Sequence, residues 1–167
     1  MNGISKTGAF IRPADTTQYA VGDVMAAVTT PLTLPFLSLP LMSGGCFKIE
    51  SAVAFSSACQ GTKPSVDLML FSSDITDLDS DNATFTPTDA QLLTFVGKIS
   101  FAAANWLGGD LTSGAGGNAY CQAASVGLMV QATNLYGVAV AVNTYTPIAS
   151  EVFTFRLNFL RDFMRDV

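Results

Sequence analysis

The stretch FTFRLNF, residues 153–159, decides the fold class of this chain. Its apolar and polar positions alternate without interruption, with Phe153, Phe155, Leu157 and Phe159 set against Thr154, Arg156 and Asn158. A period of two is typical of a β-strand that buries one face and exposes the other. The stretch therefore predicts a half-buried strand in the last part of the chain.

Similar alternation occurs at two other places in the sequence. Residues 95–101 alternate around Lys98. In CFKIESAVAF, residues 46–55, simple alternation predicts a buried face made of Phe47, Ile49, Val53 and Phe55. Both segments are therefore expected to form strands with one wet face.

Three further apolar runs predict more deeply buried strands, at residues 66–71, 126–131 and 135–145. The connection at 132–134 is short, which favours an antiparallel hairpin between the last two. In the last run, Tyr136 and three valines share one face opposite small residues. Six or more short strands broken by Gly, Pro and Asn favour an all-β antiparallel sandwich over a βαβ architecture.

One short helix is expected around residues 87–94. The sequence TPTD has the form of a capping box, with Thr86 as the N-cap, Pro87 as the first helical residue and Asp89 three residues after the cap. We expect a single sandwich domain over residues 1–167, with 1–45 as an extended, proline-punctuated N-terminal arm or edge region. Three prolines within residues 24–42 argue against a membrane-spanning helix there.

The composition narrows the class of protein. Hydrophobic residues make up 49% of the 167 and charged residues only 13%, which is too few to cover the surface of an ordinary soluble domain. Either the exterior is rich in Ser, Thr, Asn and Gly, as this sequence is, or part of it is buried against other subunits. The net charge of −5, without a clustered basic face, argues against a nucleic-acid partner.

Reactive groups are scarce. There is no histidine, so a serine or cysteine nucleophile would lack its usual base, and we expect no enzymatic activity and no cofactor. The three cysteines follow no paired motif, and no export signal is expected, so reduced and buried thiols are predicted in a protein assembled in the cytoplasm. The glycine-rich run at 114–119 matches a loose dinucleotide fingerprint but follows a loop instead of a strand.

An acid-rich segment offers a weak candidate for a metal site. Asp77, Asp79 and Asp81 are spaced like the opening of a calcium loop. The pattern then departs from that loop, because Asn82 stands where glycine is needed and Thr88 where glutamate is needed. An exposed, charged connection is the favoured interpretation.

Three residues are candidates for contacts between subunits. Arg12 and Asp15 are placed for an ion pair, either local or between subunits. Trp106, the only tryptophan, is expected to anchor the core, with an interface or a sugar-stacking platform as the alternative.

The order of these features resembles a family of small tailed-bacteriophage virion proteins encoded among head genes. The resemblance rests on RPADTT at 12–17, then Tyr19 and GDV at 22–24, and on EVFTF at 151–155. Between them lie comparable strands, a polar loop like 73–88 and a short acid-capped helix. The resemblance spans nearly the whole chain, although residues 24–42 and 108–117 have no counterpart in it.

This resemblance implies a jelly-roll-like β-sandwich that decorates or cements the exterior of a capsid. It implies binding to the lattice of the major capsid protein, commonly as a homotrimer, with assembly in the host cytoplasm and without a membrane. No catalytic residue is carried over. The alternative is a receptor- or carbohydrate-binding sandwich of a phage fibre or spike, in which Trp106 or an exposed tyrosine would be essential.

Overall fold

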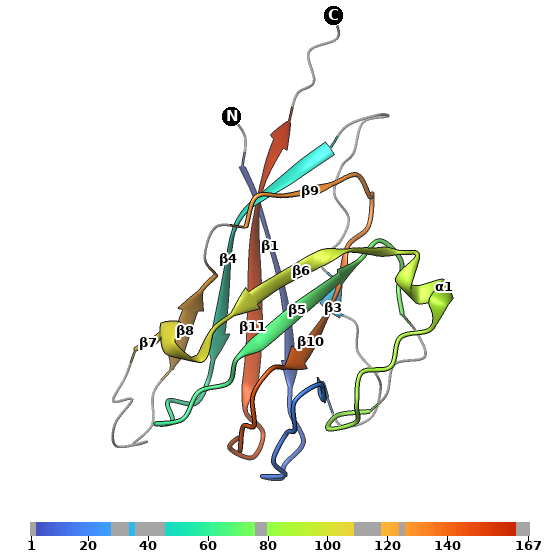
Figure 1. The fold of residues 1–167 in the computed structure, drawn as a ribbon. Helices are drawn as coiled ribbons and strands as arrows, with labels where there is room; N and C mark the ends of the chain where they lie inside the picture. The colour runs from blue at the N-terminus through green and yellow to red at the C-terminus, as the bar shows by residue number, and fades with distance from the viewer. Residues whose placement is uncertain are drawn as a thin grey trace, which may run out of the picture.

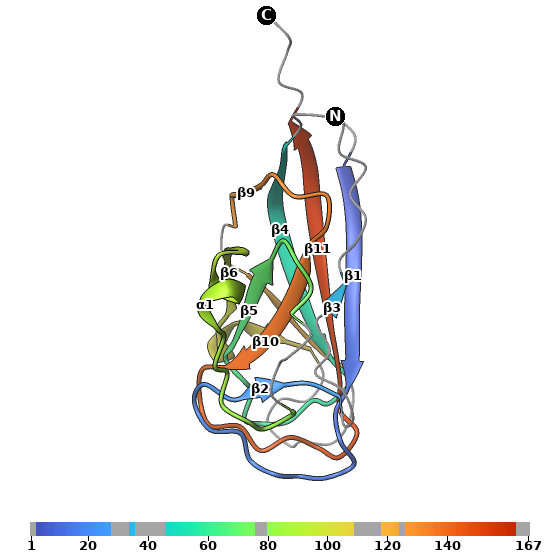
Figure 2. The ribbon, with the colours of Figure 1, turned by 90° about the vertical axis from the view of Figure 1, so that its right-hand side faces the viewer.

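Two antiparallel β-sheets packed against each other form the molecule (Figure 1), and Figure 2 shows the two layers from the side. The computed structural model describes residues 3–27, 34–35, 46–75, 80–108, 118–123 and 126–162. The predicted all-β sandwich is confirmed. Within the described residues, no helix has the length and apolar character needed to cross a bilayer.

Each sheet draws strands from both halves of the chain. The first sheet has the order β1 (Gly3–Ile11), β11 (Val152–Asp162), β4 (Cys46–Ser56), β8 (Ala119–Gln122) and β7 (Trp106–Leu107), and β9 (Leu128–Val130) also pairs with β4. The second sheet has the order β2 (Val24–Met25), β10 (Tyr136–Ala141), β5 (Val66–Phe71) and β6 (Phe95–Phe101), and β3 (Leu34–Pro35) also pairs with β10. A 3₁₀ turn, η1 (Ala103–Asn105), precedes β7.

The strand pairing is that of a jelly roll. Strands β1 and β11 pair, as do β2 and β10, β4 and β8, and β5 and β6, so that the pairs are nested from the outside of the chain inward. A long antiparallel hairpin rolled into two layers produces this order. The segment 3–11 is thus an edge strand of the first sheet, and β2 is an edge strand of the second.

The core between the sheets follows from the alternation in β11. Phe153, Phe155, Leu157 and Phe159 are all buried, as predicted, and each alternate residue faces outward. Phe155 meets Phe101 of the opposite sheet with ring centroids 5.6 Å apart. All three cysteines are buried and free, which confirms their expected role as small apolar side chains.

The face predicted for the second half of β4 is wrong. Ser51 pairs with Asn158 and Ile49 pairs with Phe159, so Glu50 is an extra residue that forms a β-bulge. A bulge shifts the alternation by one position. Phe47 and Ile49 point inward as predicted, but beyond the bulge Ala52 and Ala54 are buried while Val53 and Phe55 are turned outward.

The predicted hairpin between 126–131 and 135–145 is also wrong. Strand β9 pairs with β4 in the first sheet, whereas β10 pairs with β2, β3 and β5 in the second. The connection at 131–135 therefore crosses from one layer to the other. Strand β10 is buried on both faces. It forms its hydrogen bonds with β2, β3 and β5, which are distant in the sequence, and not with β9, its neighbour along the chain.

The short helix is present but starts later than predicted. It is α1 (Asp89–Leu92), and its N-cap is Thr88, not Thr86. The Gln91 N–H donates to the Thr88 hydroxyl at 3.3 Å, and the Thr88 N–H donates to the Gln91 side chain at 2.7 Å. Glutamine at the third helical position makes the box at Thr88 reciprocal, which explains the later start.

The chain itself covers part of the outer face of the second sheet. A second apolar cluster forms there from Val24, Ala26, Phe71, Ile75, Val138 and Val140, with Met69 and Phe85 packed against it. Phe85 belongs to the connection that leads to α1, and its ring lies edge-on to Phe71 at 6.3 Å. Small residues on the inner face of β10, Ala139 and Ala141, join the main core.

Candidate functional site

Three connections gather at the end of the sandwich away from the two termini (Figure 1). They are residues 12–23 between β1 and β2, 57–65 between β4 and β5, and 142–151 between β10 and β11. We call this region the loop end. Backbone hydrogen bonds join the connections, from Arg12 N–H to Glu151 O at 2.9 Å and from Tyr19 N–H to Tyr145 O at 2.9 Å.

A buried ion pair fixes the first connection. The Arg12 side chain is 0% exposed, and its Nη2 lies 3.1 Å from Asp81 Oδ2, whose side chain is 7% exposed. Arg12 Nε also donates to the Tyr19 hydroxyl, which donates to Asp81 Oδ1 at 2.5 Å. The Ala26 N–H donates to the same carboxylate at 2.9 Å. Burial, followed by the neighbouring Asp81, raises the pKa of Tyr19, so the phenol stays protonated.

Two sequence candidates therefore meet in one cluster, although 69 residues separate them. Asp81, considered above for calcium, has both oxygens engaged by protein donors. Asp77 and Asp79 lie outside the described residues, and within those described no group of three or more metal-ligating side chains occurs. The calcium hypothesis stays a prediction.

Asp15 is a secondary partner of Arg12. Its Oδ1 lies 3.5 Å from Arg12 Nη2, and its side chain is half exposed. It accepts from the Thr17 N–H at 2.9 Å, and that backbone hydrogen bond is the main cause that lowers the pKa of Asp15. The local ion pair between Arg12 and Asp15 thus exists, but Asp81 is the closer and more buried partner.

A second buried carboxylate ties the other two connections together. Glu151 accepts from the Ser56 hydroxyl at the end of β4, from the Tyr145 hydroxyl at 2.8 Å and from the Ile148 N–H at 3.4 Å. The Gln60 amide lies 2.8 Å from the same tyrosine oxygen. Burial raises the pKa of Glu151 and outweighs these hydrogen bonds, which act to lower it.

Lys63 and Trp106 complete the buried layer beneath the loop end. The Lys63 ammonium donates to Ala58 O and lies 5.8 Å from the centre of the Trp106 ring. Burial lowers the pKa of Lys63. Trp106 is 3% exposed, and its Nε1 donates to Pro64 O at 2.8 Å. It is a core anchor, and neither its side chain nor that of Arg12 is open to a partner.

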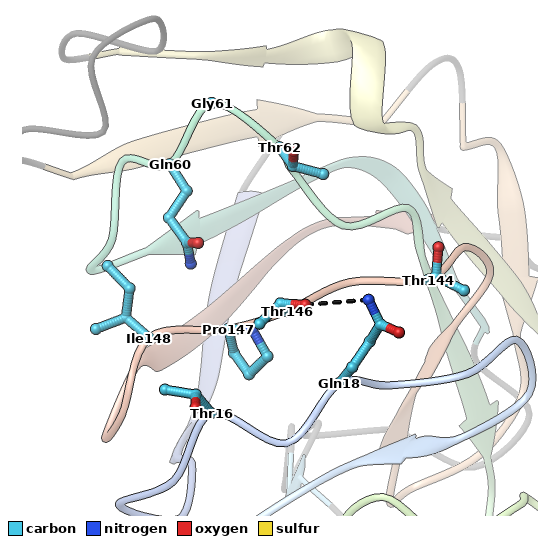
Figure 3. Close-up of a pocket in the computed structure, with 9 residues that line it drawn as sticks. All are labelled: Thr16, Gln18, Gln60, Gly61, Thr62, Thr144, Thr146, Pro147 and Ile148. Atoms are coloured by element: carbon cyan, nitrogen blue, oxygen red, sulfur yellow. Dashed lines mark hydrogen bonds between the residues drawn. The ribbon is translucent and has the colours of Figure 1, made fainter.

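Above this layer lies a cavity of about 770 Å³, shown in Figure 3. Hydroxyl and amide side chains dominate its walls: Thr16, Gln18, Gln60, Thr62, Thr144 and Thr146. Gln18 Nε2 donates to Thr146 Oγ1 at 3.1 Å and links the first connection to the third (Figure 3). The size lies within the range of small-ligand sites, about 300–1,000 Å³.

The outer face of the first sheet presents a different kind of surface. Cross-strand pairs place side chains in one row over five strands, which we call the apolar row: Leu107, Tyr120, Phe55, Thr154 and Ala9. Leu107 is 56% exposed and Tyr120 45% exposed. The Arg156 guanidinium lies 5.2 Å from the centre of the Phe55 ring. The bulge at Glu50 is what turns Phe55 to this face.

Sequence reasoning missed Glu151, Tyr145 and Lys63 as members of one buried cluster. The available signal was weak: Glu151 directly precedes the most regular strand, and Lys63 follows a polar turn. Their proximity depends on the jelly-roll pairing and not on any local motif. No protein-family model matches the chain, and a search of the curated proteins finds no match.

Proposed function

We propose that this chain is a non-catalytic structural protein of a tailed-phage virion. In this proposal it decorates or cements the capsid exterior as a homo-oligomer, with a trimer as the expected form, by docking on the lattice of the major capsid protein. The observation that carries the proposal is the apolar row. Its Leu107 and Tyr120 side chains are exposed on the outer face of the first sheet, next to the partly buried Phe55.

The contrast between the two sheets supports this assignment. On the second sheet, Phe85 and Ile75 from its own connection pack over Phe71 and the outer valines, and Phe95 at the start of β6 is 38% exposed. The first sheet leaves Leu107 and Tyr120 half exposed, and Phe55 is the cross-strand partner of Tyr120 on its other side. Contiguous exposed apolar surface is typical of a face that binds another protein, and aromatic residues and arginine are enriched in such interfaces.

The fold and the composition are compatible with a capsid-decorating role, but they do not distinguish it from other roles. Jelly rolls occur in viral capsid proteins and also in lectins, so fold alone does not assign a role. The resemblance of the RPADTT start and the EVFTF finish to phage virion proteins favours the capsid. A charged fraction of 13% suits a subunit that buries surface on a particle.

The buried carboxylates also fit a structural role. Asp81 and Glu151 each accept hydrogen bonds from three groups of the chain itself. Glu151 is buried, and the side chain of Asp81 is only 7% exposed. Such groups hold connections in place. This arrangement favours a rigid scaffold over a reacting centre.

The test is saturable binding of the purified protein to undecorated heads of the parent virion, measured by co-sedimentation. A Leu107→Asp/Tyr120→Asp variant is expected to lose binding because it charges the apolar row. Leu93→Asp is the matched control, since Leu93 is 88% exposed but lies after α1, outside the apolar row. Undiminished binding of the double variant, with an unchanged circular dichroism spectrum, would refute docking through this face.

Light scattering on the same samples separates head binding from self-association. The wild type is expected at three times the mass of one chain. A double variant that becomes monomeric would assign the apolar row to contacts between copies instead of to the capsid lattice. Loss of head binding with the trimer retained is the expected result.

A further inference from the structure

The cavity at the loop end has the features of a built binding site. Its walls come from three connections that are far apart in the sequence, at 16–18, 60–62 and 144–148. None of the described residues that line it carries a charge. Three of its threonines, Thr16, Thr62 and Thr144, are exposed, and their hydroxyls have no hydrogen-bond partner among the described residues.

Buried groups beneath the cavity fix its walls in advance. Glu151 and Tyr145 hold the third connection, and Gln60 joins the second connection to them. The Arg12 and Asp81 pair holds the first. Burying a charged side chain costs free energy of desolvation, and the side chains of Arg12, Asp81 and Glu151 are buried or nearly so at this one end of the molecule. Such a layer holds the backbone that carries the wall threonines in place before a ligand arrives, which reduces the entropy lost on binding.

The wall chemistry selects the class of ligand. Threonine hydroxyls both donate and accept hydrogen bonds, as the hydroxyls of a sugar do. Pro147 and the half-exposed Ile148 add apolar surface on one side of the cavity, suited to the C–H face of a sugar ring (Figure 3). Among the described residues that line these walls, an anion would find no cationic side chain.

We propose that the cavity at the loop end binds a neutral saccharide, through the hydroxyls of Thr16, Thr62 and Thr144. This role is separate from docking through the apolar row, because the row lies on the outer face of the first sheet and shares no residue with the cavity. It also differs from a sugar platform at Trp106, because that ring is buried.

The experiment screens the full-length protein on an array of neutral and anionic oligosaccharides, then titrates the best neutral trisaccharide in solution by NMR. Binding to neutral members is expected. Thr62→Val/Thr144→Val removes two hydroxyls at nearly constant volume and should weaken binding about tenfold or more. Thr7→Val, on the exposed side of β1, is the matched control and should leave the Kd unchanged.

Three results would overturn this proposal: no binding to any neutral member of the array, stronger binding to anionic members, or equal affinity in the double threonine variant. The head-binding assay keeps the two proposals distinct. The threonine variant is expected to bind heads normally, and the Leu107→Asp/Tyr120→Asp variant to keep its saccharide affinity. Loss of head binding in the threonine variant would instead assign the cavity to the capsid contact.

Discussion

Replacing Asp81 with alanine is expected to leave the Arg12 guanidinium buried without its main counter-charge. The Arg12 side chain is fully buried and that of Asp81 nearly so, so solvent screens the pair little. Removing one partner of such a pair costs about 3–5 kcal/mol. Arg12 keeps Tyr19 and the more distant Asp15, which places the expected loss near the lower end, about 3 kcal/mol.

The assay is urea unfolding followed by circular dichroism, with a thermal scan alongside. A loss of about 3 kcal/mol corresponds to a fall in Tm of about 6–12 °C for a chain of this size. Asp81→Asn, which keeps an acceptor for the Ala26 N–H, should lose less than Asp81→Ala. Asp15→Ala is the matched control, and its midpoint should move far less because Asp15 is half exposed.

A double-mutant cycle with Arg12→Met isolates the pair itself. Once Asp81 is alanine, removing the arginine charge should cost little or restore stability, because an unpaired buried charge is also removed. If Asp81→Ala costs less than about 1 kcal/mol, or no more than Asp15→Ala, the pair is not the structural tie described above.

Three further predictions concern stability. Burial raises the pKa of Glu151 above its unfolded value of 4.5, so its contribution to stability should fall as pH rises from about 4.5 toward the raised pKa. Glu151→Gln should remove that slope in urea titrations at a series of pH values. Parallel plots of unfolding free energy against pH for the wild type and the variant would contradict this. Gly108→Ala should cost about 1–3 kcal/mol, because φ is +112° and a Cβ would lie 2.8 Å from Asn118 O; an unchanged urea midpoint would count against this. Trp106→Phe should cost about 1–3 kcal/mol by leaving Pro64 O without its donor, and calorimetry showing an unshifted Tm would dismiss the hydrogen bond as a stabilising contact.

The parts of the fold that could be predicted are those where local pattern and environment agree. Strand β11 is half-buried along its whole described length, so its alternation shows which face is inside. The bulge at Glu50 leaves no trace in composition, because it adds one residue without changing the residue types around it. The outward turn of Phe55, and with it the apolar row, therefore could not be read from alternation.

Individual residues of the site could be predicted from the sequence, but their arrangement could not. Arg12 and Asp81 each stand out in the sequence, but their pairing depends on how the sheets are rolled together. Nothing in the sequence around Glu151 indicates that it is buried, because the groups that surround it come from β4 and from two of the three connections at the loop end. Long-range topology, and not any motif, decides which polar residues become neighbours.

The pairing of the first strand with the last has a consequence for how the chain folds. Strand β1 is synthesised long before its partner β11, because the other strands of both sheets lie between them in the sequence. Until then β1 is an unpaired edge, a form that is prone to aggregate. Most of the first six residues of its sequence, GISKTGAFI, are polar or small, which limits aggregation of the strand before it pairs with β11. Closure of the first sheet is thus expected to be a late and comparatively slow step in folding.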